Sequence, residues 1–476
     1  MNESCKILDD LLEIEPGNTK TLNLYAQTLV SLGRSEEAFN LFERSLQIEL
    51  NNAITLNQYA NSLAATGQSE KALQLFERSL RIEPKDAITL SRYAATLAAA
   101  GQNEKSLQFF ERSLQLQPKD AITLSLYADT LAATGQNEKA IQLFECSLQI
   151  EPNNAITLRR YAATLAATGQ HEKSLQFFER SLQIESNDAI TLSLCAVTFA
   201  ATGQNEKAIQ LFERSLQIEP NDSITLSQYA GTLTATSQDE EALQFFERSL
   251  QIQPNNSITL SRYANALTST GRDEKALQFF ERSLQIRSNN SITLSRYAST
   301  LAATGQDEKA LQFFERSLQI RPNDAITLSR YASTLAATGQ AEEAFQVFER
   351  SLKISPNDVI TLSRYINALL KAERYRKAIE LSERLLSIEP NNSTTLVKYG
   401  SALVRAGLDL QGLEVYQNLL MLEPNNAYVL KHYGILLTSL DNYEKACSVF
   451  SHCLQIRPDN YISFQYQYFG QNLSRF

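Results

Sequence analysis

Apolar and small residues recur along the chain in two alternating helical patterns. Residues 291–324 show both patterns and serve as the reference stretch. In its first half the apolar positions follow the i, i+3, i+4, i+7 spacing of one helix face, at Leu294, Tyr297, Ala298 and Leu301. In its second half a similar spacing returns at Ala310, Leu311, Phe314, Ser317 and Leu318. The pattern therefore predicts two amphipathic helices in each such stretch.

The residues between these faces predict where each helix begins and ends. Gly305 follows the first helix, where a left-handed residue satisfies terminal carbonyl groups without strain from a Cβ atom. Asp307 is the predicted N-cap of the second helix, because its side chain can accept a hydrogen bond from a free backbone N–H. Pro322 ends that helix, and Asn323 or Asp324 is expected to cap the next one.

The prolines show that this helix–turn–helix unit repeats without insertion or deletion. Pro322 and Pro356 are 34 residues apart, and all 11 prolines of the chain fall in this register. Three further steps of the register meet Leu50, Ser186 and Ser288 instead. A strict period of this length is typical of stacked repeats, in which each unit buries its apolar face against its neighbours.

With Ser291 as position 1 and Asp324 as position 34, the repeat resembles the tetratricopeptide repeat (TPR) family. The resemblance covers thirteen periods, residues 19–460, and implies an all-α fold: a right-handed superhelical solenoid of 34-residue helix–turn–helix repeats. Ser317 stands where the family prefers alanine, and we expect its hydroxyl to donate to a carbonyl one turn earlier. The residues that carry the resemblance are Leu294, Tyr297, Ala298, Leu301, Gly305, Ala310, Phe314 and Pro322.

The two ends of the chain depart from the full repeat. Residues 1–18 supply only a second helix, with Leu8, Leu11 and Leu12 at positions predicted to be buried. This half-repeat is either a polar N-terminal cap or the sign of truncation from a longer protein. Residues 461–476 are rich in tyrosine and phenylalanine and are predicted to form an aromatic C-terminal capping helix. The alternative is a docking surface for a partner or for a second copy.

Composition and motifs narrow the functions that the chain can have. The 5 cysteines are scattered without CxxC spacing, which favours a reducing compartment and predicts no metal site. The sequence shows no basic leader with an apolar core and no membrane-length apolar run, so we expect a cytoplasmic protein. Nucleotide-binding and hydrolase motifs are absent, and the 3 histidines form no triad pattern. We therefore predict no enzyme activity, no catalytic residue, no cofactor and no membrane contact.

The resemblance also implies where a ligand would bind. In TPR proteins the first helices line the concave surface, with ligand contacts at positions 2, 5, 6, 9, 12 and 13. Here position 5 is mostly serine and positions 12 and 13 mostly alanine, which predicts a low-relief floor. Position 6 is basic in seven repeats, and Lys431 lies at position 5 of the last one. The predicted peptide-binding residues are Arg92, Arg160, Arg262, Arg296, Arg330, Arg364, Lys398 and Lys431.

These basic residues, on a chain of net charge −9, predict an extended, acidic protein segment as the partner. Packed helices lie ~8–10 Å apart and an extended chain advances ~3.3 Å per residue. One basic residue would therefore meet about every third residue of the segment. The competing interpretation is that the arginines pair with carboxylates of neighbouring helices and only solubilise the surface. A sequence pI of about 5.2 and the lack of stacking aromatics at these positions disfavour a nucleic acid.

The sequence thus predicts a non-catalytic protein–protein interaction scaffold or adaptor. Two alternatives stay open. The chain could be the sensor arm of a larger signalling ATPase-type protein, which the half-repeat at the start favours. It could also be a structural rod that self-associates through the aromatic tail. Folds of this kind host many unrelated roles, so the pattern does not identify the partner.

Overall fold

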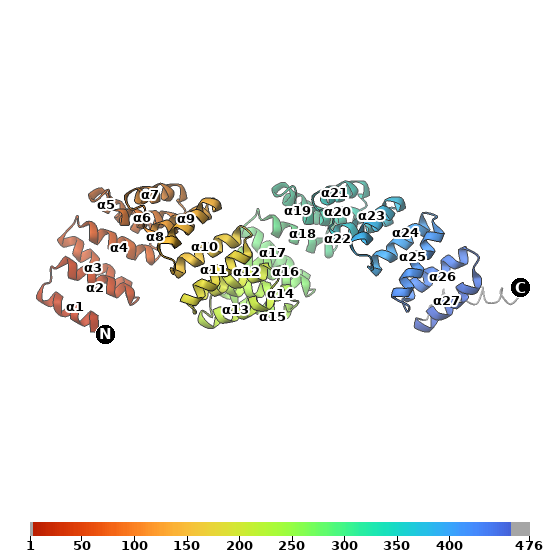
Figure 1. The fold of residues 1–476 in the computed structure, drawn as a ribbon, viewed down its shortest axis with the longest axis horizontal. Helices are drawn as coiled ribbons and strands as arrows, with labels where there is room; N and C mark the ends of the chain where they lie inside the picture. The colour runs from red at the N-terminus through yellow and green to blue at the C-terminus, as the bar shows by residue number, and fades with distance from the viewer. Residues whose placement is uncertain (1–2, 458–476) are drawn as a thin grey trace. The chain divides into compact units, whose positions relative to one another are not determined.

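The computed structural model describes residues 3–457, and Figure 1 shows that these residues form helices joined by turns. Within that range there are 27 helices and no β-strand. The chain divides into two compact units, Met1–Ser237 and Gln238–Phe476. In each unit consecutive helices pack against one another, and after α1 they follow the predicted period. The prediction of an all-α repeat solenoid is confirmed.

A repeat consists of a 13-residue first helix and a 14-residue second helix, as α18 and α19 show. The helices of the first unit are α1 (Glu3–Ile14), α2 (Thr19–Ser31), α3 (Ser35–Ile48), α4 (Ala53–Ala65), α5 (Ser69–Ile82), α6 (Ala87–Ala99), α7 (Asn103–Leu116), α8 (Ala121–Ala133), α9 (Asn137–Ile150), α10 (Ala155–Ala167), α11 (His171–Ile184), α12 (Ala189–Ala201), α13 (Asn205–Ile218) and α14 (Ser223–Ala235). Those of the second unit are α15 (Asp239–Ile252), α16 (Ser257–Ser269), α17 (Asp273–Ile286), α18 (Ser291–Ala303), α19 (Asp307–Ile320), α20 (Ala325–Ala337), α21 (Ala341–Ile354), α22 (Val359–Lys371), α23 (Tyr375–Ile388), α24 (Ser393–Arg405), α25 (Asp409–Leu422), α26 (Ala427–Ser439) and α27 (Tyr443–Ile456).

The turn inside the reference repeat is closed by a left-handed glycine, as predicted. Gly305 has φ 77°. Its N–H donates to the Ala302 carbonyl at 3.1 Å, and the Gln306 N–H reaches back to the Leu301 carbonyl at 2.9 Å. These two bonds form a Schellman motif. The predicted N-cap of α19 is wrong, because Gln306 holds that position without a side-chain bond, and Asp307 lies in the first turn. There its negative charge still favours the positive end of the helix dipole.

Position 34 caps the first helix of the following repeat, as expected. The Asn290 side chain accepts a hydrogen bond from the Thr293 N–H at 3.1 Å. The Asp358 carboxylate accepts one from the Thr361 N–H at 2.9 Å. Each bond satisfies a backbone donor that the helix itself leaves free. Asp324 holds the same N-cap position before α20 but makes no side-chain bond to the backbone, and its carboxylate accepts a bond from the Thr327 hydroxyl instead.

The core runs between the two helices of each repeat and into the next repeat. Phe314 on α19 is 1% exposed, and its ring centroid lies 6.1 Å from that of Tyr331 on α20. The predicted bond of Ser317 within its own helix is wrong. Its Oγ donates to the carbonyl of Ser291, the first residue of α18, at 2.8 Å. The small serine lets α18 and α19 approach closely, and this brings the carbonyl of the neighbouring helix within reach.

Two turns of the later repeats place a non-glycine residue in the left-handed region. Glu373 has φ 59° and Asp441 has φ 57°. Replacing Glu373 by glycine is expected to stabilise the second unit by about 1 kcal/mol, because the Cβ of an L-residue crowds the following carbonyl there. Urea unfolding followed by far-UV circular dichroism measures the change. As a control, Gly339→Ala introduces a Cβ at φ 88° with no atom within 4 Å, so it should destabilise through backbone strain alone. A Glu373→Gly protein no more stable than wild type would contradict the strain argument.

The structure describes most of residues 1–18, so the prediction for this segment can be compared with it. On α1, Leu8 and Leu12 are buried as predicted, but Leu11 is 45% exposed. In the full repeats the equivalent residue, for example Ser317, contacts the first helix of its own repeat, and the described residues include no such helix before α1. The predicted aromatic helix of residues 461–476 lies outside the described residues.

Candidate functional site

The predicted binding residues lie on the first helices of their repeats, each with a half-buried side chain. Arg92 is on α6 and Arg160 is on α10, both in the first unit, and Lys431 is on α26 of the second. Position 6 of the last repeat, which sequence reasoning did not single out, is His432. We call the following five residues of the second unit, which occupy position 6 on α16, α18, α20, α22 and α24, the cationic row: Arg262, Arg296, Arg330, Arg364 and Lys398.

The two arginines of the first unit have polar partners within that unit. The Nη1 of Arg92 donates to the Asn57 Oδ1 on α4 at 2.6 Å. The Nε of Arg160 lies 3.5 Å from the Asp129 Oδ2 on α8. In both pairs the arginine reaches the first helix of the preceding repeat. For these two residues, the interpretation as local structural contacts accounts for the side-chain position.

The middle of the cationic row is different. Within the described residues, the side chain of neither Arg296 nor Arg330 makes a hydrogen bond or an ion pair. Burial lowers the pKa of the Arg296 guanidinium, and Arg262 lowers it further. Burial also lowers the pKa of Arg330, as do Arg364 and Arg296, while Asp324 opposes the shift. Arginine keeps its charge at neutral pH. These two positive charges are therefore close to one another and partly shielded from water. A bound anion would stabilise both charged side chains.

The last two members of the cationic row have neutral partners. The Nη1 of Arg364 donates to the Ser329 Oγ at 3.3 Å, and the Nζ of Lys398 donates to the Ser363 Oγ at 3.0 Å. Burial lowers the pKa of both cations, and Asp358 opposes the shift at Arg364. Neither hydroxyl group carries a charge, so neither cation is neutralised by its hydrogen-bond partner.

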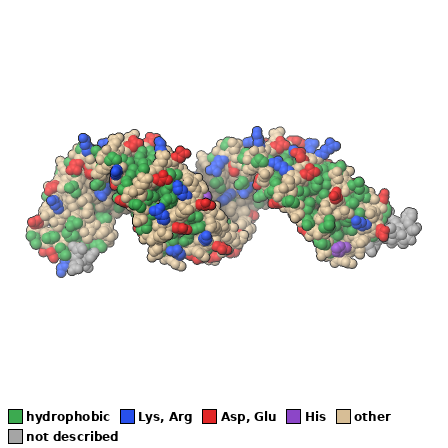
Figure 2. Space-filling model, in the orientation of Figure 1, with side chains coloured by type: hydrophobic (Ala, Val, Ile, Leu, Met, Phe, Trp, Pro, Cys, Tyr) green, Lys and Arg blue, Asp and Glu red, His purple; other side chains and the backbone are tan. Residues whose placement is uncertain are grey.

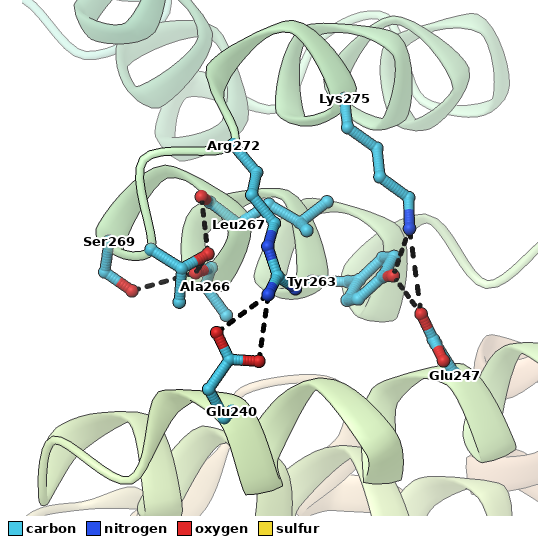
Figure 3. A network of polar contacts seen from close by, with 9 residues as sticks. Glu240, Glu247, Tyr263, Ala266, Leu267, Ser269, Arg272 and Lys275 are labelled. Atoms are coloured by element: carbon cyan, nitrogen blue, oxygen red, sulfur yellow. Dashed lines mark hydrogen bonds and ion pairs between the residues drawn. The ribbon is translucent and has the colours of Figure 1, made fainter.

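Two carboxylates of the second helix α15 bind tyrosine, lysine and arginine side chains that do not belong to the cationic row (Figure 3). The Glu247 carboxylate on α15 accepts a bond from the Tyr263 hydroxyl on α16 at 2.5 Å and lies 3.7 Å from the Lys275 Nζ. The Glu240 carboxylate accepts two bonds from Arg272, at 2.8 and 2.9 Å. These contacts join α15, α16 and α17, and they pair both carboxylates with groups outside the cationic row.

The tyrosine–glutamate bond recurs between successive repeats of the second unit. Tyr297 donates to Glu281 at 2.7 Å, and Tyr331 donates to Glu315 at 3.0 Å. The second-helix glutamates Glu281 and Glu315 thus accept bonds from the tyrosines that directly follow Arg296 and Arg330 on the first helices. Burial raises the pKa of these tyrosines, with the glutamate bond adding to the shift, so the phenols stay protonated and remain donors.

The predicted serine floor is corrected by the structure. Ser295 at position 5 is buried, and its Oγ accepts a bond from the Thr327 hydroxyl of the next first helix at 2.8 Å. The same bond joins Thr293 to Ser261 at 3.0 Å. The serines therefore lie in the seam between successive first helices, because threonine at position 3 offers them a partner that the single-repeat pattern did not reveal.

Sequence reasoning missed a second feature of this face. Isoleucine stands at position 2 of the first helices from Ile54 to Ile360, a signal that the repeat alignment contained. We call the four that accompany the arginines of the second unit the apolar row: Ile258, Ile292, Ile326 and Ile360. Their side chains are 48%, 50%, 62% and 59% exposed, respectively. They are not among the buried core residues.

Within residues 3–457, no group of three or more histidine, cysteine, aspartate and glutamate side chains is placed to hold a metal ion. The described helices also include none with the length and apolar character required to cross a bilayer. The free cysteines include Cys195, which is buried. It takes the place of the tyrosine at position 7, and burial raises the pKa of its thiol to about 12.

The stacked helix pairs define an α-helical repeat protein, and the first helices of its second unit carry the half-buried cationic row. Sequence profiles described as tetratricopeptide repeat match most of the chain, and the chain belongs to this family. The matched residues are 19–85, 51–119, 85–152, 153–221, 221–289, 256–323, 289–357, 335–398 and 432–460.

A solved structure has a similar fold. A chain in the crystal structure of the APC/C hetero-tetramer Cut9–Hcn1 is similar, with a TM-score of 0.57 and 11% identity. The likeness covers 96% of this chain and 97% of that one, and at this identity it concerns the fold alone. No curated protein matches the chain.

Proposed function

We propose that the protein is a non-catalytic interaction scaffold, acting in the cytoplasm, that binds an extended acidic protein segment along the cationic row of its second unit. The observation that carries the proposal is the pair Arg296 and Arg330. Their side chains are half-buried, adjacent in the row and without a hydrogen bond or ion pair among the described residues. Desolvated like charges destabilise a fold unless something compensates. A bound carboxylate would supply that compensation.

The dimensions of the row fit a chain rather than a small anion. Successive first helices lie ~8–10 Å apart, and an extended segment advances ~3.3 Å per residue. A segment crossing the row would therefore meet one cation about every three residues. A charged hydrogen bond contributes roughly 1.5–3 kcal/mol, so a few partly desolvated contacts reach micromolar affinity.

Two observations favour a protein over a nucleic acid. The first is the net charge of −9, which repels a polyanion at long range. The second is the environment of the tyrosines at position 7: Tyr297 and Tyr331 are buried, and their hydroxyls are bound to glutamates. They cannot offer the ring faces on which bases stack.

The test measures binding of a labelled glutamate-rich peptide, a glutamine-rich peptide of equal length and a single-stranded RNA by fluorescence anisotropy. We expect the glutamate peptide to bind and the glutamine peptide not to bind. We also expect its affinity to fall about tenfold or more between low and physiological salt, since screening weakens each ion pair. Tighter binding of the RNA, or equal binding of both peptides, would overturn the proposal.

A further inference from the structure

The first helices of the second unit carry two rows of side chains on one face. The apolar row lies at position 2 and the cationic row at position 6, four residues apart. Residues with this spacing are neighbours on a helix surface, with about 5–6 Å between their Cβ atoms. The four isoleucines of the apolar row leave about half or more of each side chain exposed on successive first helices. Contiguous exposed apolar side chains of this kind mark interaction surfaces.

The first unit shows what the space between these positions is like. A cavity of about 230 Å³ opens between α4 and α6, and its lining includes Ile54 and Ile88 at position 2 and Arg92 at position 6. The rest of the lining consists of Gln27, Ala53, Asn57, Gln58, Glu83 and Asp86. The isoleucine and arginine positions of neighbouring repeats thus face a common hollow. In the second unit the same two positions hold the two rows.

We propose that the segment bound by the second unit alternates acidic and apolar residues, with the acidic side chains on the cationic row and the apolar side chains on the apolar row. This inference rests on the proposed function and adds the chemistry of the partner. An extended chain directs successive side chains to opposite sides. A segment lying between two parallel rows therefore presents every second residue to each row, about 6.6 Å apart. This interval is shorter than the ~8–10 Å between first helices, so in an alternating sequence a residue of the right kind lies close to every side chain of each row.

An anionic membrane surface carries the same combination of charge and apolar character, but the burial of the arginines favours a peptide. Arg296 and Arg330 are half-buried and flanked by exposed isoleucines, Ile292 and Ile326. Basic residues that bind lipid headgroups project into the surface potential of the bilayer. A side chain of a narrow segment can reach a recessed guanidinium, whereas a flat surface contacts only what projects. Figure 2 shows hydrophobic side chains dispersed among charged ones on the face that it displays.

The experiment compares three labelled peptides of about twelve residues, a length that spans four first helices at the spacings given above. One alternates glutamate and valine, the second has the same composition in blocks, and the third alternates glutamate and serine. We expect the alternating glutamate–valine peptide to bind about tenfold or more tightly than either other peptide, because burying several valines adds apolar contact at equal charge. Anionic lipid vesicles provide a further arm and are expected not to bind.

Two protein variants locate the effect. The first changes Ile292, Ile326 and Ile360 of the apolar row to serine. The second is a matched control that changes three isoleucines of similar exposure at the ends of second helices to serine, namely Ile286, Ile320 and Ile354. Circular dichroism shows whether each variant is folded.

The apolar-row variant is expected to lose the preference for the alternating glutamate–valine peptide while keeping its affinity for the glutamate–serine peptide, and the control is expected to keep both. Equal affinity of the three peptides for wild type would overturn this inference and leave the proposed function standing. Failure of every peptide to bind would overturn both. If the wild type bound vesicles and the apolar-row variant did not, the ligand of this surface would be a membrane and the peptide proposal would be overturned.

Discussion

Replacing Arg296 and Arg330 by glutamine is expected to weaken binding of the acidic segment by at least about 100-fold, while leaving the protein at least as stable as the wild type. Each replacement removes a charged contact of roughly 1.5–3 kcal/mol with the segment. It removes no hydrogen bond or ion pair within residues 3–457. It also relieves the repulsion that neighbouring arginines exert in the row. Peptide anisotropy and urea unfolding measure the two quantities.

The matched control replaces Arg92 and Arg160, which hold the same position but have partners. Their substitution breaks the contacts with Asn57 and Asp129, so we expect a small loss of stability and less than about a threefold loss of affinity. The combination of lost binding with retained stability distinguishes a ligand-binding role from a structural one. A double variant of Arg296 and Arg330 that binds as wild type does would refute the assignment of the cationic row.

Much of the fold could be predicted from the sequence because the period fixes both the turns and the buried positions. Gly305 adopts the left-handed conformation that its place between two apolar patterns predicts, and Leu294, Ala298 and Phe314 are buried as expected. The errors concern contacts that a single period does not contain. Asp307 does not cap α19, and the Ser317 hydroxyl bonds to a carbonyl on another helix. Whether a polar side chain is satisfied locally or across a helix crossing depends on how closely two helices approach.

The positions of the candidate site residues could be predicted from the sequence, but the hydrogen-bond partners of their side chains could not. The repeat register correctly assigned Arg296 and Arg330 to first helices, yet Arg92 has the same place in its repeat and a different environment. The difference arises from position 5 of the preceding repeat. Asn57 offers an acceptor to Arg92 at 2.6 Å, whereas the serines that precede Arg296 and Arg330, Ser261 and Ser295, are bonded to threonines in the seam. Pairing of this kind appears only when two neighbouring repeats are considered together in space.

The largest effect on stability is expected from Phe314→Ala. The Phe314 side chain is 1% exposed, and its ring packs against Tyr331 of the next repeat at a centroid distance of 6.1 Å. Truncation leaves a cavity between α19 and α20 and removes the contact between two repeats. Such a change costs about 3–5 kcal/mol, measured as the loss of unfolding free energy in urea by far-UV circular dichroism.

The adjacent Phe313 provides the matched control, because it differs from Phe314 in environment and not in chemistry. It is half-buried, lies edge-on to Tyr297 at 4.8 Å and carries the Arg316 guanidinium over its ring at 5.1 Å. Phe313→Ala should therefore cost only about 1–2 kcal/mol. Because each repeat contacts only its neighbours, Phe314→Ala should also raise amide hydrogen exchange first in α18 to α21, before the rest of the second unit. Equal costs for the two substitutions, or a uniform rise in exchange, would show that stability is not held repeat by repeat.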